Sequence, residues 1–192
     1  MKRIATQMAT VALMLNLGVA GIYAQQGPVK MTASGTNVAS PSLNLAPNTI
    51  TDEVNFGGTG TLGPFTYREL HADSLSPQSS SACVGGTGLY IPTLAGAGVF
   101  RFQDGSLLTI GLTAGALCID LTAGVAHFTA TYKITGGTGH FKRASGTLTL
   151  TSAVAPVEFD ASGNPVFLTN AGEFHGEISG VSIGEDGQNP RQ

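Results

Sequence analysis

The sequence predicts an all-β protein, a single antiparallel β-barrel of about eight strands. Apolar and polar residues alternate over several short segments, which is the period of a strand with one buried face. Turn residues separate these segments at intervals of about 8–12 residues. After residue 24, no segment has apolar residues at helical spacing over three turns. Consecutive hairpins leave two free sheet edges. Because closure removes those edges, a barrel is favoured over a sandwich.

The clearest alternation runs from Val125 to Thr151 and predicts a long hairpin. The Gly-rich segment 136–139 divides it, since glycine reaches the positive φ that tight reversals require. The face that we expect to be buried carries Phe128, Tyr132, Leu148 and Leu150.

Turn chemistry and apolar alternation place the remaining elements. Asp104-Gly105 between apolar runs predicts a second hairpin, and residues 75–81 read as an exposed loop. Strands are expected within 25–42, 51–55, 65–73, 99–102, 107–110, 117–121, 157–159, 165–168 and 172–183.

The N-terminal segment has the layout of a secretory signal peptide. Lys2 and Arg3 precede a mostly apolar run and small residues, which predicts cleavage after Ala24. Residues 1–24 are then the signal peptide, and 25–192 form one barrel domain with a short frayed tail. No later segment has the 18 or so apolar residues of a spanning helix, so we expect no transmembrane segment in the mature chain. The expected location is secreted or periplasmic.

The charge balance argues against nucleic acid as a partner. Without Lys2 and Arg3 the chain keeps seven basic and twelve acidic residues, a net charge of −5. The basic residues do not cluster beyond Lys142 and Arg143, so they form no basic patch that could bind a phosphate backbone. The sequence does not indicate an oligomeric state.

Two cysteines, Cys83 and Cys118, remain in the exported chain. An even count in an oxidising compartment favours a disulfide between them. The alternative is a pair of buried free thiols, because Cys118 lies in an apolar run where cysteine behaves as a small hydrophobe.

Two expected strands carry polar residues in an E-x-H-x-[DE]-like pattern on one face. Together the two faces could supply imidazole and carboxylate ligands to a metal ion if the strands were neighbours and both faces pointed inward. The alternative is that both are ordinary solvent-facing sides, most clearly in the second, where apolar residues occupy the opposite face. The aromatic residues of the first strand share its polar face, so its direction stays open, and Glu69 is our candidate for a buried functional carboxylate. The two faces carry Phe65, Tyr67, Glu69, His71 and Asp73, and Glu173, His175, Glu177 and Ser179.

Known cofactor motifs are not found. Gly58, Gly60 and Gly63 satisfy GxGxxG, but Pro64 and a strand follow instead of a helix that could hold a phosphate. Serine nucleophile elbows, HExxH and paired CxxC motifs are absent from the sequence. We therefore predict no cofactor and no metal.

The segment ITGGTGHFKRASGTLTL, residues 134–150, resembles the GGTG-x-F-x-x-A-x-G segment of allene oxide cyclases and plant dirigent proteins. The resemblance implies a small eight-stranded antiparallel barrel. Both families shelter a reactive apolar molecule inside the barrel without a cofactor. Their catalytic residues do not match positions of this sequence.

Three functions remain open at this point. The first is a barrel that binds a small, largely apolar molecule in its interior. The second is a cyclase- or isomerase-like enzyme in which Glu69, with Tyr67 on the same strand face, acts as an acid/base or electrostatic group. The third is an inert structural or surface protein. A lined cavity is required by the first two and must be absent for the third.

Overall fold

The computed structural model describes residues 24–40, 43, 45–79, 83 and 88–182. The predicted signal peptide, except for Ala24, and the predicted frayed tail from residue 184 lie outside the described residues. Within the described ranges no helix is long and apolar enough to cross a membrane.

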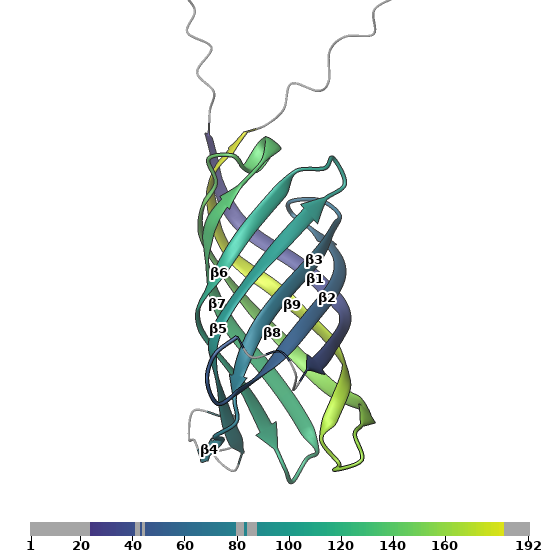
Figure 1. The fold of residues 1–192 in the computed structure, drawn as a ribbon. Helices are drawn as coiled ribbons and strands as arrows, with labels where there is room; N and C mark the ends of the chain where they lie inside the picture. Colours follow the sequence, from purple (N-terminus) through teal and green to yellow (C-terminus); the bar gives the residue numbers. More distant parts are fainter. Residues whose placement is uncertain (1–23, 41–42, 44, 80–82, 84–87, 183–192) are drawn as a thin grey trace, which may run out of the picture.

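Nine antiparallel strands form one sheet that closes on itself (Figure 1). The order is β3-β2-β1-β9-β8-β7-β6-β5, and β3 also pairs with β5, so eight strands form a closed ring. The two-residue β4 adds to the edge of β5. The predicted eight-stranded antiparallel barrel is confirmed. The strands are β1 (Ala24–Ser40), β2 (Thr49–Gly60), β3 (Phe65–Ser74), β4 (Gln78–Ser79), β5 (Leu89–Phe102), β6 (Leu107–Asp120), β7 (Val125–Gly137), β8 (Ser145–Phe159) and β9 (Pro165–Ser182).

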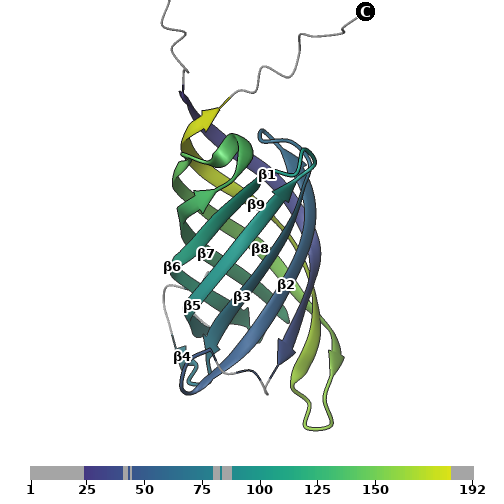
Figure 2. The ribbon, with the colours of Figure 1, turned by 45° about the horizontal axis from the view of Figure 1, so that its top comes forward.

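The two ends of the barrel differ. The start of β1, the end of β9 and the short 3₁₀ helix η1 (Gly139–Phe141) lie at the end that we call upper (Figures 1 and 2). The turn after β6, the turn after β8 and β4 lie at the opposite, lower end. At the upper end, Phe141 of η1 packs on Phe102 with ring centroids 4.6 Å apart.

The strands are longer than the sequence predicted. The predicted strands 107–110 and 117–121 are joined in one strand, β6, which ends at Asp120. The predicted strands 165–168 and 172–183 are likewise joined in β9, which is described up to Ser182, and the first part of β5 was not predicted. The Gly-rich segment 57–60 continues β2 and is not a turn. Glycines inside these strands make room for neighbouring side chains, so they do not mark strand ends.

Aromatic side chains fill the upper half of the barrel. Tyr67 packs against Phe100 and Phe174 with centroids 4.5 and 5.1 Å away. In the central hairpin, the face that was predicted to be buried points into the barrel, so this prediction is confirmed. Buried on that face are Phe128, Tyr132, Leu148 and Leu150.

The predicted disulfide is present. Cys83 and Cys118 are bonded, with Cα atoms 5.5 Å apart. Cys118 lies on β6, so the bridge ties the connection between β3 and β5 to the lower half of the barrel wall.

Candidate functional site

A cavity of about 440 Å³ occupies the lower end of the barrel. Its lining comes from all eight strands of the ring; the walls are mainly apolar, while the inner end is polar. The loops after β3 and β8 border its mouth. The apolar wall consists of Ile50, Ile91, Leu117, Ile119, Phe128, Val154 and Leu168, and the inner end carries Asp52, His71 and Asp73.

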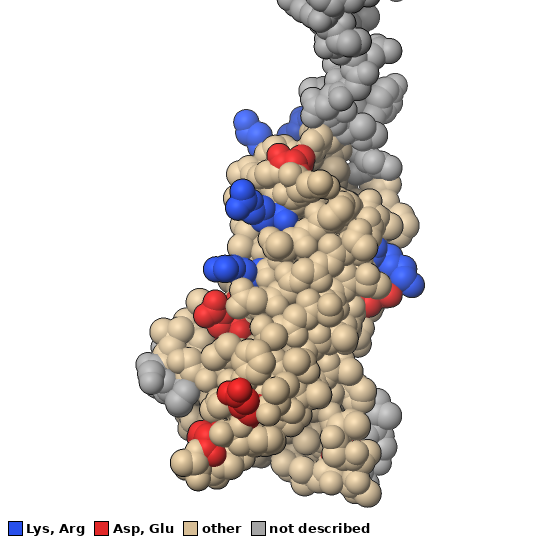
Figure 3. Space-filling view, turned by 90° about the vertical axis from the view of Figure 1, so that its right-hand side faces the viewer, with Lys and Arg blue, Asp and Glu red and all other residues tan. Residues whose placement is uncertain are grey.

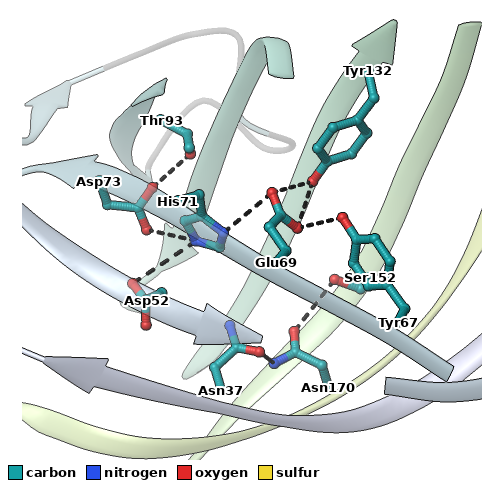
Figure 4. A network of polar contacts seen from close by, with 10 residues as sticks. All are labelled: Asn37, Asp52, Tyr67, Glu69, His71, Asp73, Thr93, Tyr132, Ser152 and Asn170. Atoms are coloured by element: carbon teal, nitrogen blue, oxygen red, sulfur yellow. Dashed lines mark hydrogen bonds and ion pairs between the residues drawn. The ribbon is translucent and has the colours of Figure 1, made fainter. Parts of the chain in front are cut away.

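Strand pairing brings the polar inner end together. On β3, His71 and Asp73 point inward with Tyr67 and Glu69 of the same face, as period-two alternation requires. Asp52 lies on β2 directly opposite His71 in the antiparallel register. The Nε2 atom of His71 lies 3.9 Å from Asp52 Oδ2 and 3.6 Å from Asp73 Oδ2 (Figure 4).

Glu69 lies one step deeper than His71, between the cavity and the aromatic core. Its carboxylate accepts hydrogen bonds from the hydroxyls of Tyr67, at 2.8 Å, and Tyr132, at 2.9 and 3.0 Å (Figure 4). Its Oε1 atom also lies 3.5 Å from Nδ1 of His71. Only 2% of Glu69 is exposed, and it does not line the cavity. Glu69 therefore reaches the cavity only through His71.

A bulge fixes the position of Asp73. The register between β3 and β5 shifts between Ala72 and Asp73, so that Asp73 pairs with Thr93. The Thr93 hydroxyl donates a 2.6 Å hydrogen bond to Asp73 Oδ1. This bond leaves Oδ2 of Asp73 to face His71.

Two glycines of β5 make room for the β3 side chains. Gly98 is paired with Glu69, and a Cβ atom there would lie 2.5–2.7 Å from the Tyr67 ring. Gly96 is paired with His71, and its Cβ would approach His71 Cβ to 2.9 Å. Real Cβ atoms essentially never come this close, so the site requires β5 to carry glycine at both positions.

The ionisable groups perturb one another strongly. Burial raises the pKa of Asp52 from 3.8 to about 6, although the imidazole of His71 opposes the rise. Burial lowers the pKa of His71, but the carboxylates of Asp73 and Glu69 outweigh it and hold that pKa well above 6.5. Burial and the nearby Glu69 raise the pKa of Tyr67 and Tyr132 well above 10, so both hydroxyls stay protonated donors.

Basic side chains lie away from this site. All six described Lys and Arg residues are exposed on the outer face of the barrel. Figure 3 shows one side of the molecule, where charged side chains are few and only acidic ones appear in the lower third. The three buried carboxylates of the interior therefore have His71 as their basic neighbour.

The structure brings together one of the two polar faces found in the sequence. The β3 face points inward, and Glu69 and Tyr67 are buried and hydrogen-bonded to each other. The β9 face points outward, with His175 and Glu177 exposed and Phe174 buried on the opposite face. Strands β1 and β2 separate β3 from β9. A metal site shared by the two faces is therefore ruled out.

Two residues of the site were not predicted from the sequence. Tyr132 was assigned to the buried face as a packing residue, and its bond to Glu69 spans 63 residues of sequence. Asp52 was not singled out, although Asp52, Val54 and Phe56 alternate on one face of β2. That alternation places an aspartate among apolar residues and is the signal that could have identified it.

No protein-family model matches the chain, and no curated protein is similar to it in sequence. Among solved structures, that of the pterocarpan synthase dirigent protein GePTS1 is similar at 12% sequence identity and a TM-score of 0.43, covering 88% of this chain and 92% of that one. The assignment as a barrel rests on the closed strand order, and the resemblance of the segment 134–150 to allene oxide cyclases and dirigent proteins stays a prediction.

Proposed function

We propose that this protein binds a small, largely apolar molecule in the lower cavity. The observation that carries the proposal is a hollow with apolar walls and a polar inner end, which adjoins the packed aromatic side chains of the core. Its volume of about 440 Å³ falls within the roughly 300–1,000 Å³ of small-molecule sites. An inert structural protein would have no need of such a cavity, so the third function is not proposed.

The inner end of the cavity defines the polar group of the ligand. Asp52 and Asp73 are hydrogen-bond acceptors, and His71 presents Nε2 beside them. A hydroxyl or amine at one end of an apolar ligand would find partners there. The ligand class is therefore an amphipathic small molecule that enters with its polar end first.

The rim of the cavity favours access by such a molecule. Leu75 lines the cavity and is 58% exposed, and Leu121 and Phe159 at the turns of the same end are 66% and 57% exposed. Exposed apolar side chains gathered at one place are typical of sites that meet an apolar partner.

Native mass spectrometry of protein purified from its own source tests the proposal directly. We expect a small molecule to co-purify, and a panel of lipids and phenols to include compounds that raise the melting temperature. A co-purifying molecule should depart when the protein is denatured. No bound molecule together with no thermal shift across the panel would overturn the proposal.

A matched pair of variants locates the site. Leu117→Trp places an indole in the cavity, whereas Leu94→Trp adds the same group at a residue that is 57% exposed and does not line the cavity. We expect Leu117→Trp to weaken binding by more than about tenfold, or 1.4 kcal/mol, and Leu94→Trp to leave it unchanged. Equal affinities in the two variants would place the ligand elsewhere.

A cofactor-free cyclase or isomerase is the second candidate function. It is favoured by the continuous contacts from Tyr67 and Tyr132 through Glu69 to His71 at the cavity surface. In this arrangement Glu69 and Tyr67 would act on the reacting molecule through His71. Glu69→Gln separates the two functions. A binding protein should keep its affinity within about tenfold, whereas an enzyme should lose turnover far beyond that.

A further inference from the structure

Three side chains at the inner end of the cavity present a set of metal-ligand atoms. One nitrogen of His71 and one oxygen each of Asp52 and Asp73 lie within 4.8 Å of one another. Ligands about 2.0–2.2 Å from a tetrahedral ion lie roughly 3.3–3.6 Å apart. The 3.6 Å distance from His71 Nε2 to Asp73 is at this spacing, and the 3.9 Å distance to Asp52 requires a shift of only a few tenths of an ångström.

The imidazole of His71 has no hydrogen-bond partner among the described residues. Only 2% of the residue is exposed, and its Nδ1 atom, which faces Glu69, is buried without a hydrogen bond. The Nε2 atom faces Asp52 and Asp73 from two strands, and both carboxylates lie beyond hydrogen-bond distance of it. Buried polar groups are nearly always paired, so the gap of 3.6–3.9 Å between Nε2 and the two carboxylates is the observation that points to a missing partner there.

The charge of the interior points to a cation. Asp52, Glu69 and Asp73 are all buried, the described Lys and Arg residues are all on the outside of the barrel, and His71 is the basic group beside the three carboxylates. Buried carboxylates are normally paired with positive charge or coordinate a metal, and one imidazole is too little positive charge for three of them. A divalent ion between Asp52 and Asp73 would supply the rest.

Glu69 and Thr93 contact the proposed ligands on the sides that face away from the ion. The Thr93 hydroxyl donates its 2.6 Å hydrogen bond to Oδ1 of Asp73, the oxygen that does not face His71. Glu69 faces Nδ1 of His71 at 3.5 Å and is itself held by two tyrosine hydroxyls. Histidine ligands of metals typically donate their second N–H to a carboxylate, which fixes the ring and the tautomer.

We propose that Asp52, His71 and Asp73 bind a divalent transition-metal ion of the Zn²⁺ or Mn²⁺ class at the inner end of the cavity. One imidazole and two carboxylates suit these ions better than Mg²⁺ or Ca²⁺, which prefer oxygen ligands alone. Three protein ligands leave a coordination position that faces the cavity, as in catalytic zinc sites. The ion would take the polar end of a ligand, but the site does not depend on the organic ligand proposed above.

Calorimetric titration of the untagged, chelator-treated protein with Zn²⁺ tests the site without any organic ligand. We expect one ion per chain, weak or no binding of Mg²⁺, and visible absorption bands when Co²⁺ is the probe. Zn²⁺ should also raise the melting temperature, because it binds the folded protein at a site assembled from two strands. An unchanged melting temperature and no 1:1 binding would overturn the proposal.

Matched variants assign the ligands. Asp52→Asn and His71→Gln should each reduce Zn²⁺ affinity by at least about a hundredfold, and Glu69→Gln by about 10–100-fold through the orientation of His71. Glu53→Gln, the exposed neighbour of Asp52, and His175→Gln on the outer face of β9 should bind as the wild type does. Circular dichroism checks that each variant is folded. Should Asp52→Asn and His71→Gln both fold and retain wild-type affinity, the ion binds elsewhere and the proposal fails.

Discussion

The imidazole of His71 lies flat against the ring of Phe128, with centroids 5.1 Å apart and planes inclined by 14°. Phe128 comes from β7 and His71 from β3, so the contact joins opposite walls of the barrel across the inner end of the cavity. The phenyl ring covers one face of the imidazole and restricts its orientation to one in which Nε2 meets the two aspartates. A packing residue of the central hairpin thus holds the polar site in place.

Phe128→Ala should destabilise the protein by about 3–5 kcal/mol, the range for deleting a buried aromatic ring. Phe128 is 6% exposed, so its removal enlarges the cavity and loses its contact with His71. The free energy of unfolding in urea gives the value. Phe159→Ala, at a ring that is 57% exposed, should change it by no more than about 0.5 kcal/mol. An unchanged midpoint for Phe128→Ala would contradict the inward direction of this face.

Gly98→Ala should destabilise the protein by about 1–3 kcal/mol, the usual cost of overpacking a core. The new methyl group would collide with the Tyr67 ring, which is fully buried against Phe100 and Phe174 and has no room to withdraw. Urea denaturation of this variant is best compared with Gly57→Ala, since a Cβ at Gly57 meets no atom within 4 Å. Equal stabilities of the two variants would show that the interior is looser than described.

Removing the disulfide should cost on the order of 3–4 kcal/mol, because the bridge closes a loop of 35 residues in the unfolded chain. The comparison is between the oxidised protein and a Cys83→Ala, Cys118→Ala double variant in urea. Intact mass after alkylation provides the control for bonding. No thiol should be alkylated before reduction and two after it, and two alkylated thiols without reductant would contradict the bridge.

The turn between β5 and β6 should respond to acid. The Ser106 hydroxyl and backbone N–H donate hydrogen bonds to Asp104 and lower the pKa of that carboxyl below 3.8. A lowered folded pKa means that this contribution to stability is present above about pH 3.8 and is lost as the pH falls through the folded value.

Ser106→Ala should therefore move the pKa of Asp104 upward, toward its unfolded value. The carboxyl resonance followed by NMR between pH 2 and 6 measures the shift. Asp160, whose pKa is lowered by Asn164 in a different turn, serves as the internal control and should not move. A pKa of Asp104 that stays low in the variant would assign the effect to other groups, such as His140, whose Nε2 lies 3.1 Å from Asp104.

The barrel could be predicted because alternation records which side chains face inward, and this holds strand by strand. The lengths of the strands could not, since glycines such as Gly96 and Gly98 look like turn residues in a sequence. Their role depends on the aromatic and ionic side chains of β3, which lie about 30 residues earlier in the chain and become neighbours only through pairing.

The candidate site was predicted only in the part that lies on one strand. Glu69, His71 and Asp73 share a face of β3, and the two-residue period places them together. Asp52 joins them through the register of β2 against β3, and Tyr132 reaches Glu69 across the barrel. Contacts of this kind depend on how the ring of strands closes, which no local pattern determines.

Met31, Phe100 and Phe174 form the dense upper half of the barrel, and none of them lines the cavity. The stability of the fold and the specificity for a ligand therefore depend on different residues. Apolar substitutions at Ile50, Ile91 or Ile119 should change which ligand fits while the fold survives, because these side chains border the cavity and cores tolerate apolar replacement when patterning and total volume are kept. A chain built in this way can diversify at one end and stay constant at the other, which makes the barrel a natural starting point for engineered receptors.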